Sequence, residues 1–87
     1  MNENPRAAIM EQLKDALDRA SNGKAKLTHV SEDALIVDDL GLYSLDLLDL
    51  RYEVEDIWNL SIADEEMMSL RKVSDVIDLI VERGPAT

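Results

Sequence analysis

The sequence has no cysteine and no phenylalanine, and aromatic residues make up only 3% of its 87 residues. Without cysteine, the chain forms no disulfide and offers no thiolate to a metal or to catalysis. Because hydrophobic residues still reach 46%, the core must consist of leucine, isoleucine, valine and methionine side chains. An aliphatic core in so short a chain favours packed helices, and we expect a single domain over residues 1–87.

Long apolar runs and a secretory signal are missing as well. No segment approaches the roughly 20 apolar residues that span a bilayer. The basic residue near the N-terminus, Arg6, is not followed by the apolar run of a signal peptide. We therefore expect a cytoplasmic protein that has no contact with a membrane.

Basic residues are scarce, since nine lysines and arginines accompany nineteen acidic residues and the net charge is −10. Most of the excess lies between residues 27 and 70, where twelve acids surround a single base, Arg51. A field of this sign repels nucleic acids and attracts basic protein surfaces. The composition therefore predicts protein partners with basic docking surfaces and no nucleic-acid ligand.

The spacing of apolar residues predicts an all-α fold. Asn4 and Pro5 suit the cap and the first position of a helix, which Ser21-Asn22-Gly23 would end. The fold expected is a small four-helix bundle of three longer helices and one short helix. The ranges predicted for the helices are 5–20, 44–58, 64–69 and 72–83.

A long connection, residues 21–43, separates the first two predicted helices. Connections of this length inside a compact domain are unusual and are often functional. We expect its scattered apolar residues to hold it across the bundle. Leu35-Ile36-Val37 looks like a short strand, but the sequence offers no partner for it, and no strand is predicted.

The helix expected at 44–58 has two apolar faces when residues are placed at about 100° intervals. One face is expected to point into the core, and its members are Leu47, Leu50, Val54, Ile57 and Trp58. The second face combines apolar and acidic side chains and resembles a surface for binding partners. Its members are Leu45, Leu48, Asp49, Tyr52 and Asp56. For Leu45 the alternative is that it packs beneath the preceding loop.

Ser44 stands between an acidic, glycine-containing segment and the first turn of this helix. A catalytic serine needs a neighbouring base and an oxyanion hole. The chain has no Gly-x-Ser-x-Gly motif, and its only histidine is His29. We therefore expect no enzymatic activity, and a serine in this position is better suited to being modified itself.

Two acidic runs are candidates for metal binding, Asp38-Asp39 and Asp64-Glu65-Glu66. Neither has the alternating ligands and the central glycine of a calcium loop. Helix capping and solvation explain these residues better, so no metal site is expected.

The chain resembles the acyl carrier proteins over most of its length. The family's Asp-Ser-Leu motif, followed by an acid, corresponds to Tyr43-Ser44-Leu45-Asp46, with tyrosine in place of the aspartate. The likeness continues through an acid-rich helix that ends in a bulky aromatic residue, a segment similar to Ile-Pro-Asp-Glu-Glu, and a Val-x-x-x-Ile helix. The residues at these places are Trp58, Ile62-Ala63-Asp64-Glu65-Glu66, Val73 and Ile77.

This resemblance implies that Ser44 receives 4′-phosphopantetheine from coenzyme A, and that the thiol of this arm carries an acyl or aminoacyl group as a thioester. It also implies a monomeric carrier that meets a phosphopantetheinyl transferase, a loading ligase and downstream transferases. The docking residues that it implies are Leu45, Asp46, Leu48, Asp49, Tyr52, Glu55 and Asp56.

Three positions depart from the family's pattern, namely Tyr43, Arg51 and Ala63, where an acid, an apolar residue and a proline are usual. Burying an unpaired guanidinium beside methylene groups is costly, so Arg51, together with Trp58, favours short, polar or aminoacyl cargo. Tyr43 in the motif favours a specialised pathway. Pairing of Arg51 with Glu55 on the helix surface is the alternative. Tyr43 also leaves open a second function, an unmodified acidic helical adaptor that does not need Ser44.

Overall fold

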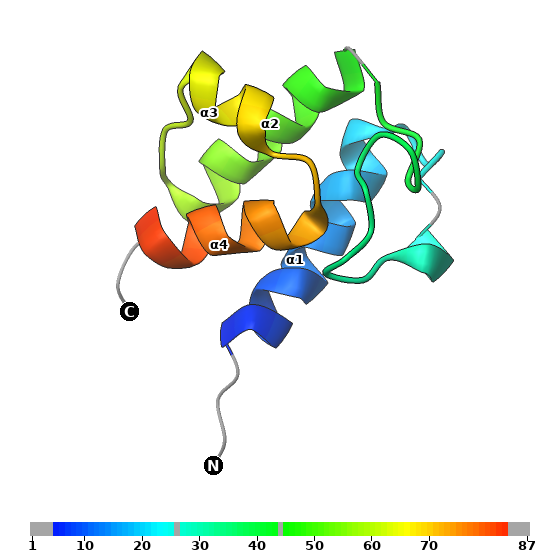
Figure 1. Ribbon diagram of the computed structural model, residues 1–87, viewed down its shortest axis with the longest axis horizontal. Helices are drawn as coiled ribbons and strands as arrows, with labels where there is room; N and C mark the ends of the chain where they lie inside the picture. The colour runs from blue at the N-terminus through cyan, green and yellow to red at the C-terminus, as the bar shows by residue number, and fades with distance from the viewer. Residues whose placement is uncertain (1–4, 26, 44, 84–87) are drawn as a thin grey trace.

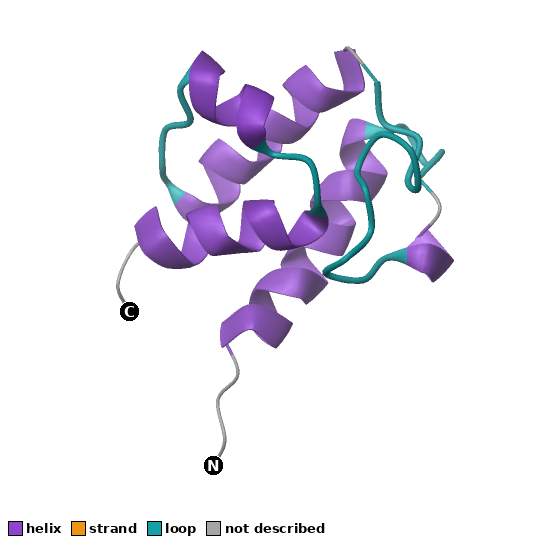
Figure 2. Ribbon diagram, viewed as in Figure 1, coloured by secondary structure: helices purple, strands orange, loops and turns teal. Residues whose placement is uncertain are grey.

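The computed structural model describes residues 5–25, 27–43 and 45–83, which form four α-helices and one short 3-10 helix (Figure 1). The elements are α1 (Pro5–Ala20), η1 (Leu27–His29), α2 (Leu45–Trp58), α3 (Asp64–Ser69) and α4 (Val73–Arg83). Helix α1 packs against both α2 and α4. Figure 2 shows helices and loops but no strand ribbon in this part of the chain. The prediction of an all-α bundle with a long loop between its first two helices is confirmed. The helix cap predicted at Asn4 and the predicted first residue of the second helix, Ser44, lie outside the described residues.

Helix α1 ends in a left-handed turn. Asn22 has a φ of 56° and Gly23 a φ of 81°. The N–H of Asn22 donates to the carbonyl of Arg19 at 3.2 Å, and that of Gly23 donates to the carbonyl of Asp18 at 2.9 Å. These paired bonds form a Schellman motif, which satisfies carbonyls that the helix leaves without partners. The motif sends the chain away from α1 into the long loop.

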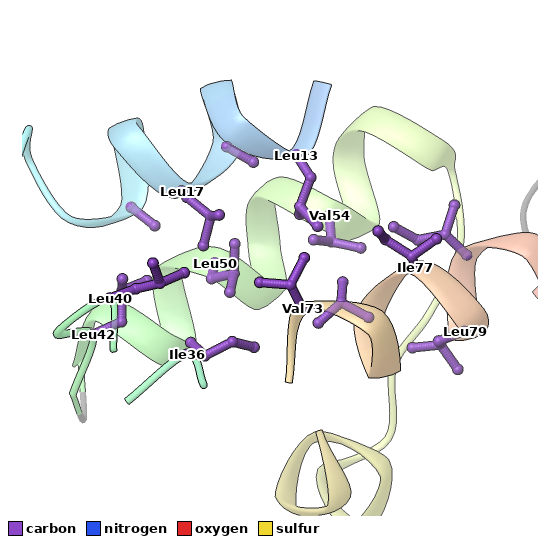
Figure 3. Close-up of a cluster of buried hydrophobic side chains, with 14 of the residues drawn as sticks. Leu13, Leu17, Ile36, Leu40, Leu42, Leu50, Val54, Val73, Ile77 and Leu79 are labelled. Carbon is purple, nitrogen blue, oxygen red and sulfur yellow. The ribbon is translucent and has the colours of Figure 1, made fainter. Parts of the chain in front are cut away.

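The core lies where α1, α2, α4 and the long loop meet (Figure 3). It is aliphatic apart from Trp58 in the described residues, as the absence of phenylalanine predicted. The labelled side chains in it include Leu13 and Leu17 of α1, Ile36, Leu40 and Leu42 of the loop, Leu50 and Val54 of α2, and Val73 and Ile77 of α4. On α2, the predicted inner face is buried at three positions and half-buried at Leu47 and Ile57, which pack against the core.

The expectation that Leu35-Ile36-Val37 has no partner is wrong. Leu35 forms an isolated antiparallel bridge with Lys72, in the connection between α3 and α4. The N–H of Ile36 also donates to the carbonyl of Arg71 at 2.9 Å. A single bridge does not require alternating apolar residues in the partner segment. The sequence around Lys72 therefore gives no indication of a strand. The bridge fixes the middle of the long loop beside the start of α4.

Arg6, in the first turn of α1, also holds the long loop between α1 and α2 in place. Its Nε donates to Oε2 of Glu32 at 3.1 Å, and its Nη1 donates to Oδ1 of Asp78 in α4 at 2.7 Å. The hydrogen bond from the guanidinium lowers the pKa of the Glu32 carboxyl below its ordinary value. The loop is therefore held by both backbone and charged side-chain contacts on its way to α2.

Candidate functional site

The predicted attachment residue, Ser44, lies outside the described residues, but both of its neighbours are placed. Tyr43 is 58% exposed and Leu45 is 73% exposed. The N–H of Asp46 donates to the carbonyl of Tyr43 at 2.7 Å, and Oδ2 of Asp46 accepts from the N–H of Tyr43 at 3.5 Å. The two sides of the predicted site are therefore fixed to each other and open to solvent.

Buried leucines anchor this exposed segment to the core. Leu40 and Leu42 are both 0% exposed, and the N–H of Leu42 donates to the carbonyl of Ile36 at 3.2 Å. Gly41 stands between them with a φ of 78°, a conformation that glycine adopts without steric cost. Because Leu42 is fixed inside the bundle, Tyr43 reaches the surface one residue after a firm anchor.

The outer face of α2 begins beside this point. Leu48 is 39% exposed and Tyr52 is 57% exposed, and Asp49 and Asp56 are exposed as well. With Leu45, these residues repeat every three or four positions and form one stripe along the helix, which we call the α2 stripe. The alternative that Leu45 packs beneath the loop is wrong.

Acidic residues at the two edges of the α2 stripe have partners inside the molecule. Glu53 accepts a hydrogen bond from Nε of Arg19 in α1 at 2.8 Å. Glu55 accepts one from the N–H of Ile62 at 2.8 Å, and its side chain is only 25% exposed. Glu55, predicted as a docking residue, thus holds the connection between α2 and α3. The carboxylates that face solvent along the stripe are those of its two aspartates.

Arg51 lies at the boundary between α2 and α3. Its Nη1 donates to Oδ1 of Asp64 at 2.6 Å, and its Nε is 3.6 Å from Oε2 of Glu55. The side chain is 22% exposed, and the neighbouring carboxylates raise its pKa, the hydrogen bond to Asp64 most of all. Pairing of Arg51 with Glu55 is one of the two interpretations that the sequence allowed for this arginine. The bond to Asp64 was missed because no helical spacing relates residues thirteen positions apart.

The described part of the chain contains no group of three or more histidine, cysteine or acidic residues that could hold a metal ion. Among the same residues, no helix has the length and apolar character needed to cross a membrane.

Sequence comparison relates the chain to curated acyl carrier proteins. It is 36% identical over 76 residues to the acyl carrier protein of Coprothermobacter proteolyticus, which covers 86% of this chain and 89% of that protein. It is 41% identical over 52 residues to that of Syntrophus aciditrophicus, covering 60% of this chain and 65% of the relative. The acyl carrier protein of Rickettsia bellii is 33% identical over 63 residues, covering 72% and 73%. No family model matches the chain.

The relatives and the structure agree. The described residues form a helical bundle with a long loop before α2, and α2 has exposed acidic residues, as the resemblance to this family predicts. The chain belongs to the acyl carrier protein family and is a carrier, not an enzyme.

Proposed function

We propose that Ser44 carries 4′-phosphopantetheine and that the α2 stripe docks the enzymes that load and unload the arm. One observation supports this above others. Tyr43 and Leu45 on either side of Ser44 are exposed, while Leu42 is fully buried. A modifying enzyme needs an open hydroxyl, and the carrier must stay folded while the enzyme binds.

The described surroundings of Ser44 fit such a group. When bound, phosphopantetheine supplies a terminal thiol that holds cargo as a thioester. Helix α2 begins at Leu45, and the positive end of a helix dipole favours a phosphate nearby. The side chains of Tyr43 and Leu45 are both exposed to solvent, so there is space at the surface for the arm.

Intact mass spectrometry tests the modification. The protein is incubated with coenzyme A and a broad-specificity phosphopantetheinyl transferase, and we expect a gain of one phosphopantetheine. A Tyr43→Asp variant, which restores the usual motif, is treated in parallel. Gain by this variant alone would show that the natural sequence requires a dedicated transferase. Gain by neither would contradict the proposal and favour the unmodified adaptor.

We propose that docking depends on the two aspartates of the α2 stripe. Asp49 and Asp56 flank Tyr52 on the exposed face, and clustered charge raises association rates more than affinity. The double variant Asp49→Asn, Asp56→Asn should be modified by the transferase about tenfold more slowly at low salt. This difference should shrink as salt screens the charges.

The matched control for this docking experiment is Asp15→Asn with Glu82→Gln. Both residues are exposed, on α1 and α4, and their replacement changes the net charge by the same amount. We expect rates of modification close to those of the unchanged protein. If the control slows the reaction equally, net charge rather than the α2 stripe governs docking.

We propose that the cargo is short, polar or aminoacyl, which places the carrier in a specialised pathway with its own loading ligase. Arg51 and its carboxylate partners Asp64 and Glu55 occupy the boundary between α2 and α3. An alkyl chain that entered there would have to separate these charges or bury them, and either is costly. In NMR spectra of a form loaded with a long acyl chain, we expect no contacts between the chain and core methyl groups. Such contacts, for example to Leu50 or Ile77, would contradict this proposal.

A further inference from the structure

Helix α3 has little apolar contact to hold it in place. It comprises six residues, and none of them is buried. Met67 is half-buried against the core, as is Leu70 just after the helix, whereas Met68 is 81% exposed. Isolated helices shorter than about 12 residues are marginal in water. The position of α3 therefore depends on contacts of another kind.

Those contacts are ion pairs made by two arginines, one from α2 and one from α4. Arg51 of α2 donates to Oδ1 of Asp64 at 2.6 Å. Arg83, the last residue of α4, donates from Nη1 to Oε1 of Glu66 at 2.7 Å. Both acids lie in the first turn of α3. Since α3 joins α2 and α4 in sequence and lies at the edge of the bundle (Figure 1), these bridges link it to the helix before it and the helix after it.

Firm anchors bound the same segment at its two ends. Ile62 is 2% exposed and Val73 is 1% exposed. Lys72 is also held by its bridge to Leu35. Residues 63–70 thus lie between two fixed points and contain no fully buried side chain of their own. A segment with few buried contacts between fixed ends is the kind that opens locally, without global unfolding.

We infer that α3 opens and closes as a unit while α1, α2 and α4 stay packed, and that the bridges Arg51–Asp64 and Arg83–Glu66 set the fraction of molecules in which it is closed. One partner of each bridge is open to solvent, Asp64 at 87% and Arg83 at 40% exposed, while Arg51 and Glu66 are 22% and 26% exposed, so salt screens both bridges in part. Ionic strength therefore regulates how often the apolar surface beneath Met67 and Leu70 is uncovered. This inference does not depend on the modification of Ser44.

Salt should act in opposite directions on α3 and on the whole bundle. The protein carries a net charge of −10, and self-repulsion of that kind destabilises the compact state. Raising salt from about 10 mM to about 1 M shortens the screening length from about 30 Å to about 3 Å. Global unfolding then becomes rarer, whereas the opening of α3 becomes more frequent.

Native-state amide hydrogen exchange measures both processes in one experiment. In the unchanged protein, we expect amides of residues 64–70 to exchange faster at high salt while those of α1 and α4 exchange more slowly or at the same rate. Arg51→Gln and Arg83→Gln should each accelerate exchange in α3 about fivefold at low salt, because each removes one of the two bridges that hold the helix.

The control is Arg19→Gln, which removes a bridge of 2.8 Å between α1 and α2 and changes the charge equally. It should leave exchange in residues 64–70 unaltered. The inference is overturned if α3 amides follow those of α1 and α4 at every salt concentration, or if Arg19→Gln accelerates them as much as Arg51→Gln. The salt series on the unchanged protein gives a result even if a variant fails to fold.

Discussion

The Ser44→Ala variant is expected to gain no mass with coenzyme A and the phosphopantetheinyl transferase that modifies the unchanged protein. The proposed linkage is a phosphodiester to the serine oxygen, and alanine has no oxygen to form it. The loss should therefore be complete rather than graded. Intact mass spectrometry, followed by mapping of the modified peptide, measures it directly.

Ser31→Ala is the matched control for this experiment. Ser31 lies in the segment between α1 and α2 and is exposed. It accepts a hydrogen bond from the N–H of Ala34 through its backbone carbonyl, which the substitution keeps. This variant should be modified like the unchanged protein, and far-UV circular dichroism should show helices in both variants. Modification of Ser44→Ala would place the arm elsewhere. Full activity of unmodified Ser44→Ala toward a partner would favour the adaptor.

Leu50→Ala is expected to lower the free energy of unfolding by about 2–5 kcal/mol. Leu50 is 1% exposed on the inner face of α2, and Figure 3 shows it among side chains of α1 and the long loop. Truncation leaves a cavity that these neighbours fill only in part. The total free energy of unfolding of a native protein is only about 5–15 kcal/mol, so this substitution would remove much of the stability. Urea unfolding followed by far-UV circular dichroism measures the change.

Leu48→Ala provides the comparison on the same helix. Leu48 lies on the α2 stripe and is 39% exposed, so its truncation should cost less than about 1 kcal/mol. A loss as large as that for Leu50→Ala would mean that the stripe is packed against other residues in solution and is not free to dock partners. The two leucines thus test which face of α2 points inward.

The sequence predicted the helices and their order because helix formation depends on residues that lie close together in the chain. Apolar residues at helical spacing and stop signals such as Ser21-Asn22-Gly23 depend only on neighbours within a few positions. The two faces of α2 follow from the same periodicity, so the exposure of Leu48 and Tyr52 could be predicted. The motif around Ser44 is also local, and with the order of the helices it was enough to indicate the family.

Contacts between distant residues were decided only by the tertiary structure. The bridge between Leu35 and Lys72 and the bond from Arg51 to Asp64 join positions that no periodicity relates. Composition counts every carboxylate alike, but folding gives Glu55 an internal partner and leaves Asp49 facing solvent. The sequence by itself therefore determined the helices, the acidic character and the candidate serine. The packing of α2 against its neighbours decided which acids remain free to meet a partner, because pairing depends on distances that exist only once the chain has folded.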